Sequence, residues 1–234
     1  MKKKVLAIIP ARGGSKGIPN KNLKKIDGKP LIYYPIALAK SIKQIDRVIV
    51  STEDKKIANI AKNLGAEIPF MRPKRLALNN TPTMPVLNYC LKRLEKLDNF
   101  IPDIIILLYA TGPLISKKTL EMALSKFIRG NYLSLVPVVE DHGHYWKKAE
   151  IDYIKMFYPK ERKNRQQTEN LLKETGGFYL FSNKVVKKFS LYGQRVGYYI
   201  VPKIEDIDID DLIDFNIAKL KLKLNKKIIL STEN

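Results

Sequence analysis

Short apolar runs alternate with longer amphipathic segments over the first two-thirds of the chain. Runs of apolar and β-branched residues predict buried strands, and they lie at residues 5–9, 47–51, 104–108 and 132–138. Segments with an apolar residue every three or four positions predict helices, and they lie at residues 30–42, 54–64, 84–94 and 117–128. Because strands and helices take turns, we expect a mostly parallel sheet with helices on both faces.

The pattern loosens in the last third of the chain. Residues 140–174 are polar and aromatic and keep neither a helical nor a strand period. We predict two more strands and a last helix, at residues 177–181, 198–201 and about 211–224. The whole chain, residues 1–234, is therefore predicted to form a single α/β domain of the three-layer αβα, Rossmann-like class, with an irregular insertion at about 139–175.

The length and the composition exclude several classes of protein. A chain of 234 residues can bury one substantial core. Its one Cys and two His, His142 and His144, exclude a disulfide framework and a cysteine-rich zinc site. No apolar run is long enough to span a bilayer, and the first run, at residues 5–9, is shorter than the core of a signal peptide. We therefore expect a cytoplasmic protein with no membrane partner.

The net charge is +20, from 43 Lys and Arg against 23 Asp and Glu. A field of this sign favours anionic partners, whether nucleotides, phosphorylated sugars or nucleic acids. The lysines are scattered along the chain rather than gathered on one predicted helix. We therefore expect a small anionic substrate and no nucleic acid, and we keep a basic nucleic-acid-binding module as the alternative from another class.

The first predicted strand leads into a basic, glycine-rich segment, residues 10–23. In an open parallel sheet this loop lies at the carboxyl edge, where ligands bind. Gly13, Gly14 and Gly17 would let a phosphate approach the backbone N–H groups, and the basic side chains of the loop would neutralise it. The spacing matches neither a P-loop nor the dinucleotide-binding fingerprint. The segment is thus either an unusual phosphate loop or an ordinary basic turn.

A pair of carboxylates stands near the end of the chain. Asp208 and Asp210 are one residue apart, so in an extended segment they point to the same side, and the isoleucines beside them face the core. Two such carboxylates favour a Mg²⁺ site that phosphate oxygens and water complete. Asp211 and Asp214 instead suit the start of the last helix as capping residues. A basic loop and a metal-binding pair together are what nucleotidyl transfer requires.

Five segments of the chain resemble one enzyme family. Residues 8–22, IIPARGGSKGIPNKN, closely resemble the signature of the acylneuraminate cytidylyltransferases, which include the CMP-sialic acid synthetases and bacterial relatives acting on legionaminic and pseudaminic acids. The other matches, in order and spacing, are GKPLI at 28–32, VSTED at 50–54, RP-x-x-LA at 72–77 and IDID-x-x-x-D at 207–214. The resemblance spans about residues 5–216 and implies a nucleotide-diphospho-sugar transferase-like fold.

The resemblance also implies a reaction and a site. CMP would move from CTP to the anomeric hydroxyl of a nine-carbon α-keto acid sugar, and pyrophosphate would leave. Arg12 and Lys21 would hold the CTP phosphates, and Asp208 and Asp210 would hold Mg²⁺, so that these four residues are the implied catalytic set. The implied nucleotide-binding residues are Ala11, Arg12, Gly13, Gly14, Ser15, Lys21, Asn22, Arg72 and Thr81.

The sugar end of the site departs from the family pattern. The family commonly has LQPTSPLR where residues 108–115 read LYATGPLI, so Tyr109 replaces a Gln and Ile115 replaces an Arg. Asn79 stands where an Asp is frequent. With fewer polar contacts, we favour a deoxygenated diacetamido sugar such as legionaminic or pseudaminic acid over N-acetylneuraminic acid. The implied sugar-binding residues are Tyr109, Thr111, Arg165, Gln166 and Thr175, the last of which replaces a usual Asn.

Two related functions stay open beside this one. A Kdo cytidylyltransferase, which acts on an eight-carbon sugar, is disfavoured because its Asp-Glu-Pro tract is absent at residues 110–113. A non-catalytic relative that only binds nucleotide is disfavoured by the intact loop and acidic pair. Since family members are typically homodimers, we expect the insertion at 139–175 to contribute to a dimer contact.

Overall fold

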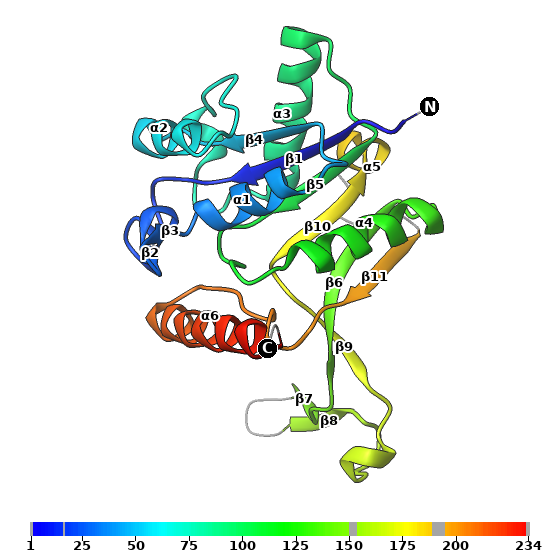
Figure 1. The fold of residues 1–234 in the computed structure, drawn as a ribbon. Helices are drawn as coiled ribbons and strands as arrows, with labels where there is room; N and C mark the ends of the chain where they lie inside the picture. The colour runs from blue at the N-terminus through cyan, green and yellow to red at the C-terminus, as the bar shows by residue number, and fades with distance from the viewer. Residues whose placement is uncertain (1, 16, 150–153, 189–194, 233–234) are drawn as a thin grey trace.

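The computed structural model describes residues 2–15, 17–149, 154–188 and 195–232, and a sheet of seven strands lies at its centre (Figure 1). Six strands follow the order β11-β6-β10-β5-β1-β4, and β9 pairs with β6 beside them. The strands are β1 (Val5–Pro10), β4 (Arg47–Ser51), β5 (Ile104–Leu108), β6 (Ser134–Asp141), β9 (Leu171–Glu174), β10 (Phe178–Ser182) and β11 (Val196–Ile200).

The sheet is mostly parallel, as the sequence predicts. β1 runs parallel to both β4 and β5, and β11 runs parallel to β6. β10 lies between β5 and β6 and is antiparallel to both, and β9 is antiparallel to β6. The chain therefore reverses direction in β9 and β10, which the pattern of apolar residues did not indicate.

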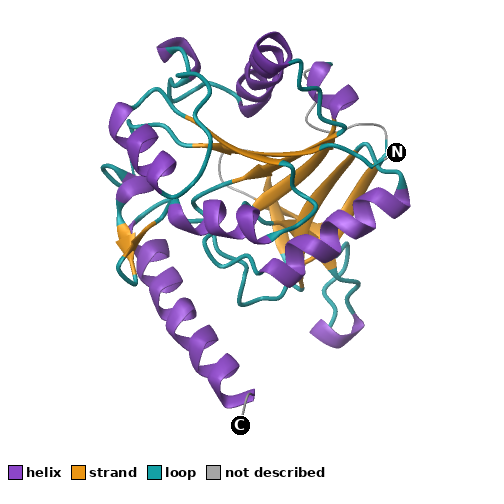
Figure 2. Ribbon diagram, turned by 45° about the horizontal axis from the view of Figure 1, so that its top comes forward, coloured by secondary structure: helices purple, strands orange, loops and turns teal. Residues whose placement is uncertain are grey.

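Helices cover both faces of the sheet and make three layers (Figure 2). Alternate residues of β1 face opposite sides: Val5, Ala7 and Ile9 pack with α1, α2 and α4, whereas Leu6 and Ile8 pack with α3 and α5. Buried Cys90, in α3, belongs to the second of these clusters, and burial raises the pKa of its thiol to about 11. The helices are α1 (Tyr33–Ser41), α2 (Lys55–Asn63), α3 (Thr83–Asp98), α4 (Lys117–Gly130), α5 (Asn183–Lys187) and α6 (Leu212–Thr232).

Two helix boundaries show which local signals decide. The Asp54 side chain accepts hydrogen bonds from two backbone N–H groups at the start of α2, and Gly65 follows this helix with a φ of +82°. The predicted helix at 30–42 begins later, at Tyr33, because Pro30 belongs to a small hairpin of β2 (Lys25–Ile26) and β3 (Lys29–Pro30). Its turn is an Asp-Gly pair, residues 27–28, with positive φ at both positions, which favours a tight hairpin.

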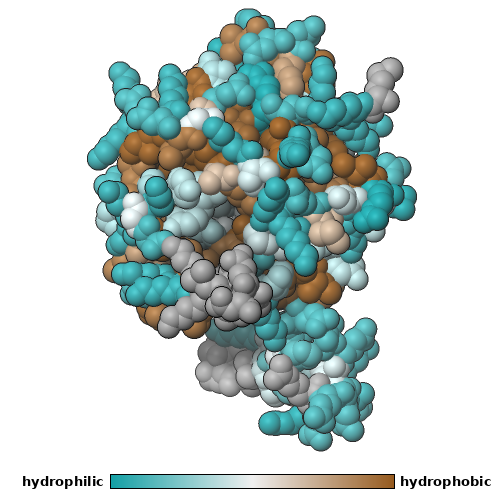
Figure 3. Space-filling view, viewed as in Figure 1, coloured by the Kyte–Doolittle hydropathy of each residue, from teal (hydrophilic) through white to brown (hydrophobic). Residues whose placement is uncertain are grey.

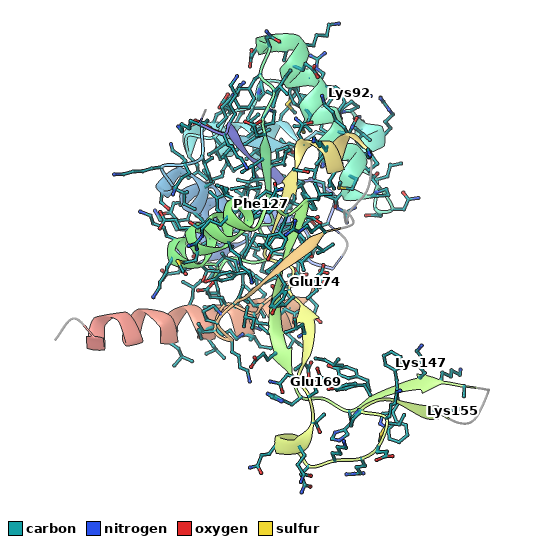
Figure 4. The ribbon with its side chains drawn as sticks, turned by 90° about the vertical axis from the view of Figure 1, so that its right-hand side faces the viewer. Lys92, Phe127, Lys147, Lys155, Glu169 and Glu174 are labelled. Atoms are coloured by element: carbon teal, nitrogen blue, oxygen red, sulfur yellow. The ribbon has the colours of Figure 1, made fainter. Side chains whose placement is uncertain are left out.

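The insertion at 139–175, called the arm below, is more regular than expected. β6 and β9 continue away from the body as a two-stranded ribbon, and beyond it lie a hairpin of β7 (Tyr145–Lys148) and β8 (Ile154–Tyr158) and a 3₁₀ turn, η3 (Arg165–Gln167). Figure 4 shows the arm standing off from the body, with Lys147, Lys155 and Glu169 on it. All of β7 is exposed, so this strand has no buried face and no alternating pattern to predict it.

The surface agrees with the scattered charge of the sequence. Hydrophilic side chains are spread over both the body and the arm in the view of Figure 3. In the ranges that the structure describes, no helix has the length and apolar character needed to cross a membrane.

Candidate active site

A cleft of about 380 Å³ opens where the parallel strands β1 and β5 end. The loop after β1, residues 72–86 and the turn after β5 form its walls, and Asp210 enters from the segment before α6. The site therefore lies at the carboxyl edge of the sheet, as expected. Of the residues predicted from the sequence, the cleft brings together Arg12, Ser15, Lys21, Asn22, Arg72, Thr81, Tyr109, Thr111 and Asp210.

Backbone contacts hold the loop after β1 in place. The buried Ala11 donates its N–H to the carbonyl oxygen of Ser51 at 3.0 Å, which extends the pairing of β1 with β4. The side chain of Asn22 donates to the carbonyl oxygen of Arg12 at 2.9 Å and is itself buried. Ser15 donates its N–H within the loop, to Gly13 at 3.2 Å. Hydrogen bonds to neighbouring segments and within the loop thus fix its described residues, which distinguishes it from an ordinary exposed turn.

The glycines of this loop serve two purposes rather than the one predicted. A Cβ added at Gly14 would meet no other atom within 4 Å, so this position is open to an approaching ligand. At Gly13 a Cβ would lie 2.6 Å from a carboxylate oxygen of Asp54, and at Gly17 it would lie 2.3 Å from the carbonyl oxygen of Asp210. These two glycines are required by close packing inside the protein, and only Gly14 fits the predicted access for a phosphate.

The two cationic side chains predicted to be catalytic both reach the cleft. Nζ of Lys21 lies 3.3 Å from Oδ1 of Asp210 and donates to the carbonyl oxygen of Ile209 at 2.7 Å. Arg12 donates to Oδ1 of Asn79 at 2.5 Å. The cations therefore contact other residues of the same cleft.

The acidic segment alternates as the sequence predicts. Ile207 and Ile209 are buried, whereas Asp208 and Asp210 are exposed. Ile209 donates its N–H to the carbonyl oxygen of Thr111 at 3.0 Å, which fixes the segment beside the turn after β5. The following acidic residues cap α6, as predicted: the carboxylates of Asp211 and Asp214 accept backbone N–H groups at 2.8–3.2 Å.

The electrostatics of Asp208 suit a cation. Partial desolvation raises the pKa of its carboxyl group, and the nearby Asp210 and Asp214 carboxylates raise it further, against the effects of Thr111 and Lys21. A divalent ion would relieve this excess of negative charge. In the described part of the chain no three His, Cys, Asp or Glu side chains gather as a metal site, so phosphate oxygens and water would complete the coordination. With that completion, the carboxylate pair fits Mg²⁺.

Three further side chains line the cleft, those of Arg72, Thr83 and Tyr109. Arg72 is 5% exposed, and its guanidinium donates to Oε2 of Glu53 at 2.8 Å. The hydroxyls of Tyr109 and Thr83 lie 2.7 Å apart, and burial raises the pKa of the tyrosine. Sequence reasoning assigned no role to Glu53 or Thr83. The signals for Glu53 were its place two positions after a predicted strand and its presence in the VSTED match at 50–54.

A comparison with known proteins decides the family. The profile of the cytidylyltransferase family matches residues 6–207. The chain is a member of the cytidylyltransferase family. The pseudaminic acid cytidylyltransferase of Campylobacter jejuni is 33% identical over 95% of this chain and 97% of its own length. The CMP-N,N'-diacetyllegionaminic acid synthase of Legionella pneumophila is 27% identical over 97% and 100%.

A more distant relative and a solved structure agree with this membership. The N-acylneuraminate cytidylyltransferase of Oncorhynchus mykiss is 29% identical over 94% of this chain and 51% of its own length. A CMP-2-keto-3-deoxy-manno-octonic acid synthetase, solved with CTP, superposes with a TM-score of 0.69 at 17% identity and covers 95% of this chain and 99% of its own. This structural likeness establishes the nucleotidyltransferase-like α/β fold of this cytidylyltransferase.

Two of the predicted sugar-binding residues, Gln166 and Thr175, are not among the residues that line the described part of the cleft of this cytidylyltransferase. Thr175 is 5% exposed at the junction of β9 and β10, and its hydroxyl has no hydrogen-bond partner among the described residues. Gln166 is exposed in η3 on the arm; Arg165 belongs to the same turn, and its side chain lies outside the described residues. Ile115, which stands where the family commonly has an Arg, is 7% exposed in the core, against Gly177, so its side chain offers a bound sugar little surface.

Proposed function

We propose that this protein transfers CMP from CTP to the anomeric hydroxyl of a nine-carbon α-keto acid sugar, with release of pyrophosphate. The observation that carries this proposal is the contact between a basic loop and an acidic segment in one cleft of a cytidylyltransferase. The names of the relatives supply the substrate class, since they specify pseudaminic, diacetyllegionaminic and N-acylneuraminic acids.

The catalytic roles follow from the chemistry of the cleft. Arg12 and Lys21 bind the triphosphate, and the open backbone at Gly14 lets it approach closely. Asp208 and Asp210 would hold Mg²⁺, which would supply positive charge to offset that of the phosphoryl oxygens. The sugar oxygen forms a bond to the α-phosphorus while the bond to the β-phosphate oxygen breaks, and the hydroxyl proton passes to water. The fixed cations stabilise the negative charge that grows on the leaving pyrophosphate.

The nucleotide contacts extend this set. Asn22, Arg72 and Thr81 all line the cleft, and the hydroxyl of Thr81 donates to the carbonyl oxygen of Arg75 at 3.3 Å. Ala11, Gly13 and Ser15 act through the shape of the loop, since the N–H group of each is engaged within the protein.

Tyr109 and Thr111 are the sugar-binding residues that the cleft itself contains. A tyrosine ring offers an acetamido methyl group an apolar face, which favours a diacetamido sugar over a more hydroxylated one. Gln166 and the turn that holds Arg165 lie on the arm and would contact the sugar only if the arm meets another site, whereas Thr175 is buried at the junction of β9 and β10.

We also propose that the whole chain acts as one catalytic unit in a homodimer joined through the arm. Apolar side chains on the arm support this, since Trp146 is 49% and Phe157 55% exposed. Arg165 and Gln166 would then serve the partner's cleft. The reaction is expected in the cytoplasm, where CTP is supplied. Sedimentation of a Trp146→Ser/Phe157→Ser variant tests the contact, because loss of the dimer is the expected result.

The reaction is tested by measuring pyrophosphate release from CTP and Mg²⁺ with four sugars in parallel: pseudaminic, N,N'-diacetyllegionaminic and N-acetylneuraminic acids, and Kdo. Turnover of a nine-carbon sugar is the expected result, with loss of turnover in Asp208→Asn. Turnover of Kdo alone would replace the substrate class. CTP binding with no turnover of any sugar would favour the non-catalytic alternative.

A further inference from the structure

Glu53 lies behind the candidate active site and is absent from the residues that line the described part of the cleft. It follows β4 by two positions, and β1 and β4 are parallel neighbours in which Pro10 lies opposite Ser51. The segments that leave these strands therefore lie side by side at the carboxyl edge of the sheet. This arrangement puts the Glu53 side chain next to the backbone of the loop after β1.

The two oxygens of the Glu53 carboxylate bind two different parts of the site. Oε1 accepts a hydrogen bond from the backbone N–H of Gly13 at 2.8 Å. Oε2 accepts one from Nη2 of Arg72 at 2.8 Å. One side chain thus ties the loop that is proposed to hold the phosphates to the arginine that is proposed to hold the nucleotide.

The ion pair with Arg72 is buried. Only 4% of the arginine side chain and 16% of the glutamate side chain are exposed. Breaking such a pair by removing one partner is costly, because the other charge stays buried without compensation. The backbone N–H of Arg72 also donates to the carbonyl oxygen of Thr52 at 2.8 Å. The position of the guanidinium therefore depends on residues 52–53, which directly follow β4.

We propose that Glu53 is a positioning residue for nucleotide binding, which holds the loop at Gly13 and the guanidinium of Arg72 in register. This inference rests on the proposed function, because it takes CTP as the ligand. Glu53 acts through these two partners. Its removal should therefore weaken CTP binding and leave sugar binding unchanged.

The matched control is Glu67, which forms an ion pair with Arg47 at 2.5 Å outside the cleft. An amide at position 53 would still accept from Gly13 with its oxygen but would turn N–H donors toward the guanidinium, which has only donors. We expect calorimetry to find CTP binding about 10- to 100-fold weaker in Glu53→Gln, by analogy with residues that orient the ligands of a metal. Glu67→Gln should bind CTP like the wild type. The KM for CTP should rise in Glu53→Gln while the KM for the sugar stays constant.

The outcomes separate the inference from the proposed function. A wild-type protein that does not bind CTP contradicts the function itself. Equal CTP affinity in wild type and Glu53→Gln overturns the inference and leaves the function standing. Glu53→Asp keeps the negative charge that compensates Arg72, but its shorter side chain weakens the contacts with Arg72 and Gly13. It therefore tests the same contacts without leaving a buried arginine unpaired. Unchanged CTP affinity in this variant also overturns the inference. Within a double-mutant cycle, Glu53→Gln should add little to the loss seen in Arg72→Gln alone.

Discussion

Lys21 and Asp210 form an ion pair in the candidate active site, although 189 positions separate them in the sequence. The lysine side chain is 15% exposed and the aspartate side chain 81%, so the pair lies at the mouth of the cleft. Lys21 also donates to the backbone of Ile209 at 2.7 Å. The pair joins the loop after β1 to the segment before α6, and both of its charges can reach the same triphosphate.

Replacing Lys21 with Met should separate stability from activity. The ion pair contributes little to folding because its Asp210 side chain is 81% exposed, and the lost hydrogen bond to Ile209 costs about 1 kcal/mol of unfolding free energy. Pyrophosphate release should fall about 100-fold or more, since a fixed donor aimed at developing charge is removed. Urea unfolding and the pyrophosphate assay measure the two effects. Equal activity in the variant and the wild type would exclude Lys21 from the phosphate site.

Asp208→Asn should abolish pyrophosphate release in the assay with Mg²⁺. The same substitution should not destabilise the protein when unfolding is measured in EDTA. Partial desolvation raises the pKa of Asp208 in the folded protein, so folding disfavours the charged form. Wild-type stability therefore falls as the pH rises through this raised pKa, and the variant escapes that loss. We expect the variant to be at least as stable as the wild type at pH about 8, with no difference below the unfolded value of about 3.9. A variant that is less stable at the higher pH would contradict this account.

The sequence predicts what local chemistry determines. The alternation of Asp208 with buried isoleucines and the capping of α6 by Asp211 and Asp214 both depend on neighbours within a few residues. Contacts between segments that are distant in the sequence leave no comparable local pattern of residues. The pairing of Lys21 with Asp210, the antiparallel insertion of β10 and the burial of Ile115 against Gly177 are set by tertiary packing, which residue patterns do not encode.

The two purposes of the loop glycines give a direct comparison. Gly17→Ala should lower the unfolding free energy by about 1–3 kcal/mol, because its Cβ would press against the backbone oxygen of Asp210. Gly14→Ala meets open space and should change this free energy by less than about 0.5 kcal/mol. Urea unfolding of both variants measures the contrast. If both variants lose the same unfolding free energy, the backbone oxygen of Asp210 moves away from position 17 and makes room for the added Cβ.

The helix cap at Asp54 allows a second stability test. Oδ1 of Asp54 accepts the N–H groups of Lys56 and Ile57 at 2.7 and 2.9 Å. Asp54→Ala should cost about 1 kcal/mol of unfolding free energy, and Asp54→Asn, which keeps the acceptor oxygen, should cost less. Thermal or urea unfolding gives the order of the three proteins. If the two variants lose the same amount, the charge rather than the hydrogen bond stabilises the helix.

Tyr109 offers a test of the sugar end of the cleft. Tyr109→Phe and Thr83→Val break the same hydrogen bond, but only the first removes the tyrosine hydroxyl from the site. If that hydroxyl contacts the sugar, Tyr109→Phe should raise the KM for the sugar about 3- to 10-fold, the value of one hydrogen bond, and leave the KM for CTP constant. Thr83→Val should then have the smaller effect, since it frees the tyrosine hydroxyl to bind the sugar. The same KM in Tyr109→Phe and the wild type would assign Tyr109 to the wall of the cleft, with its ring as the only contact.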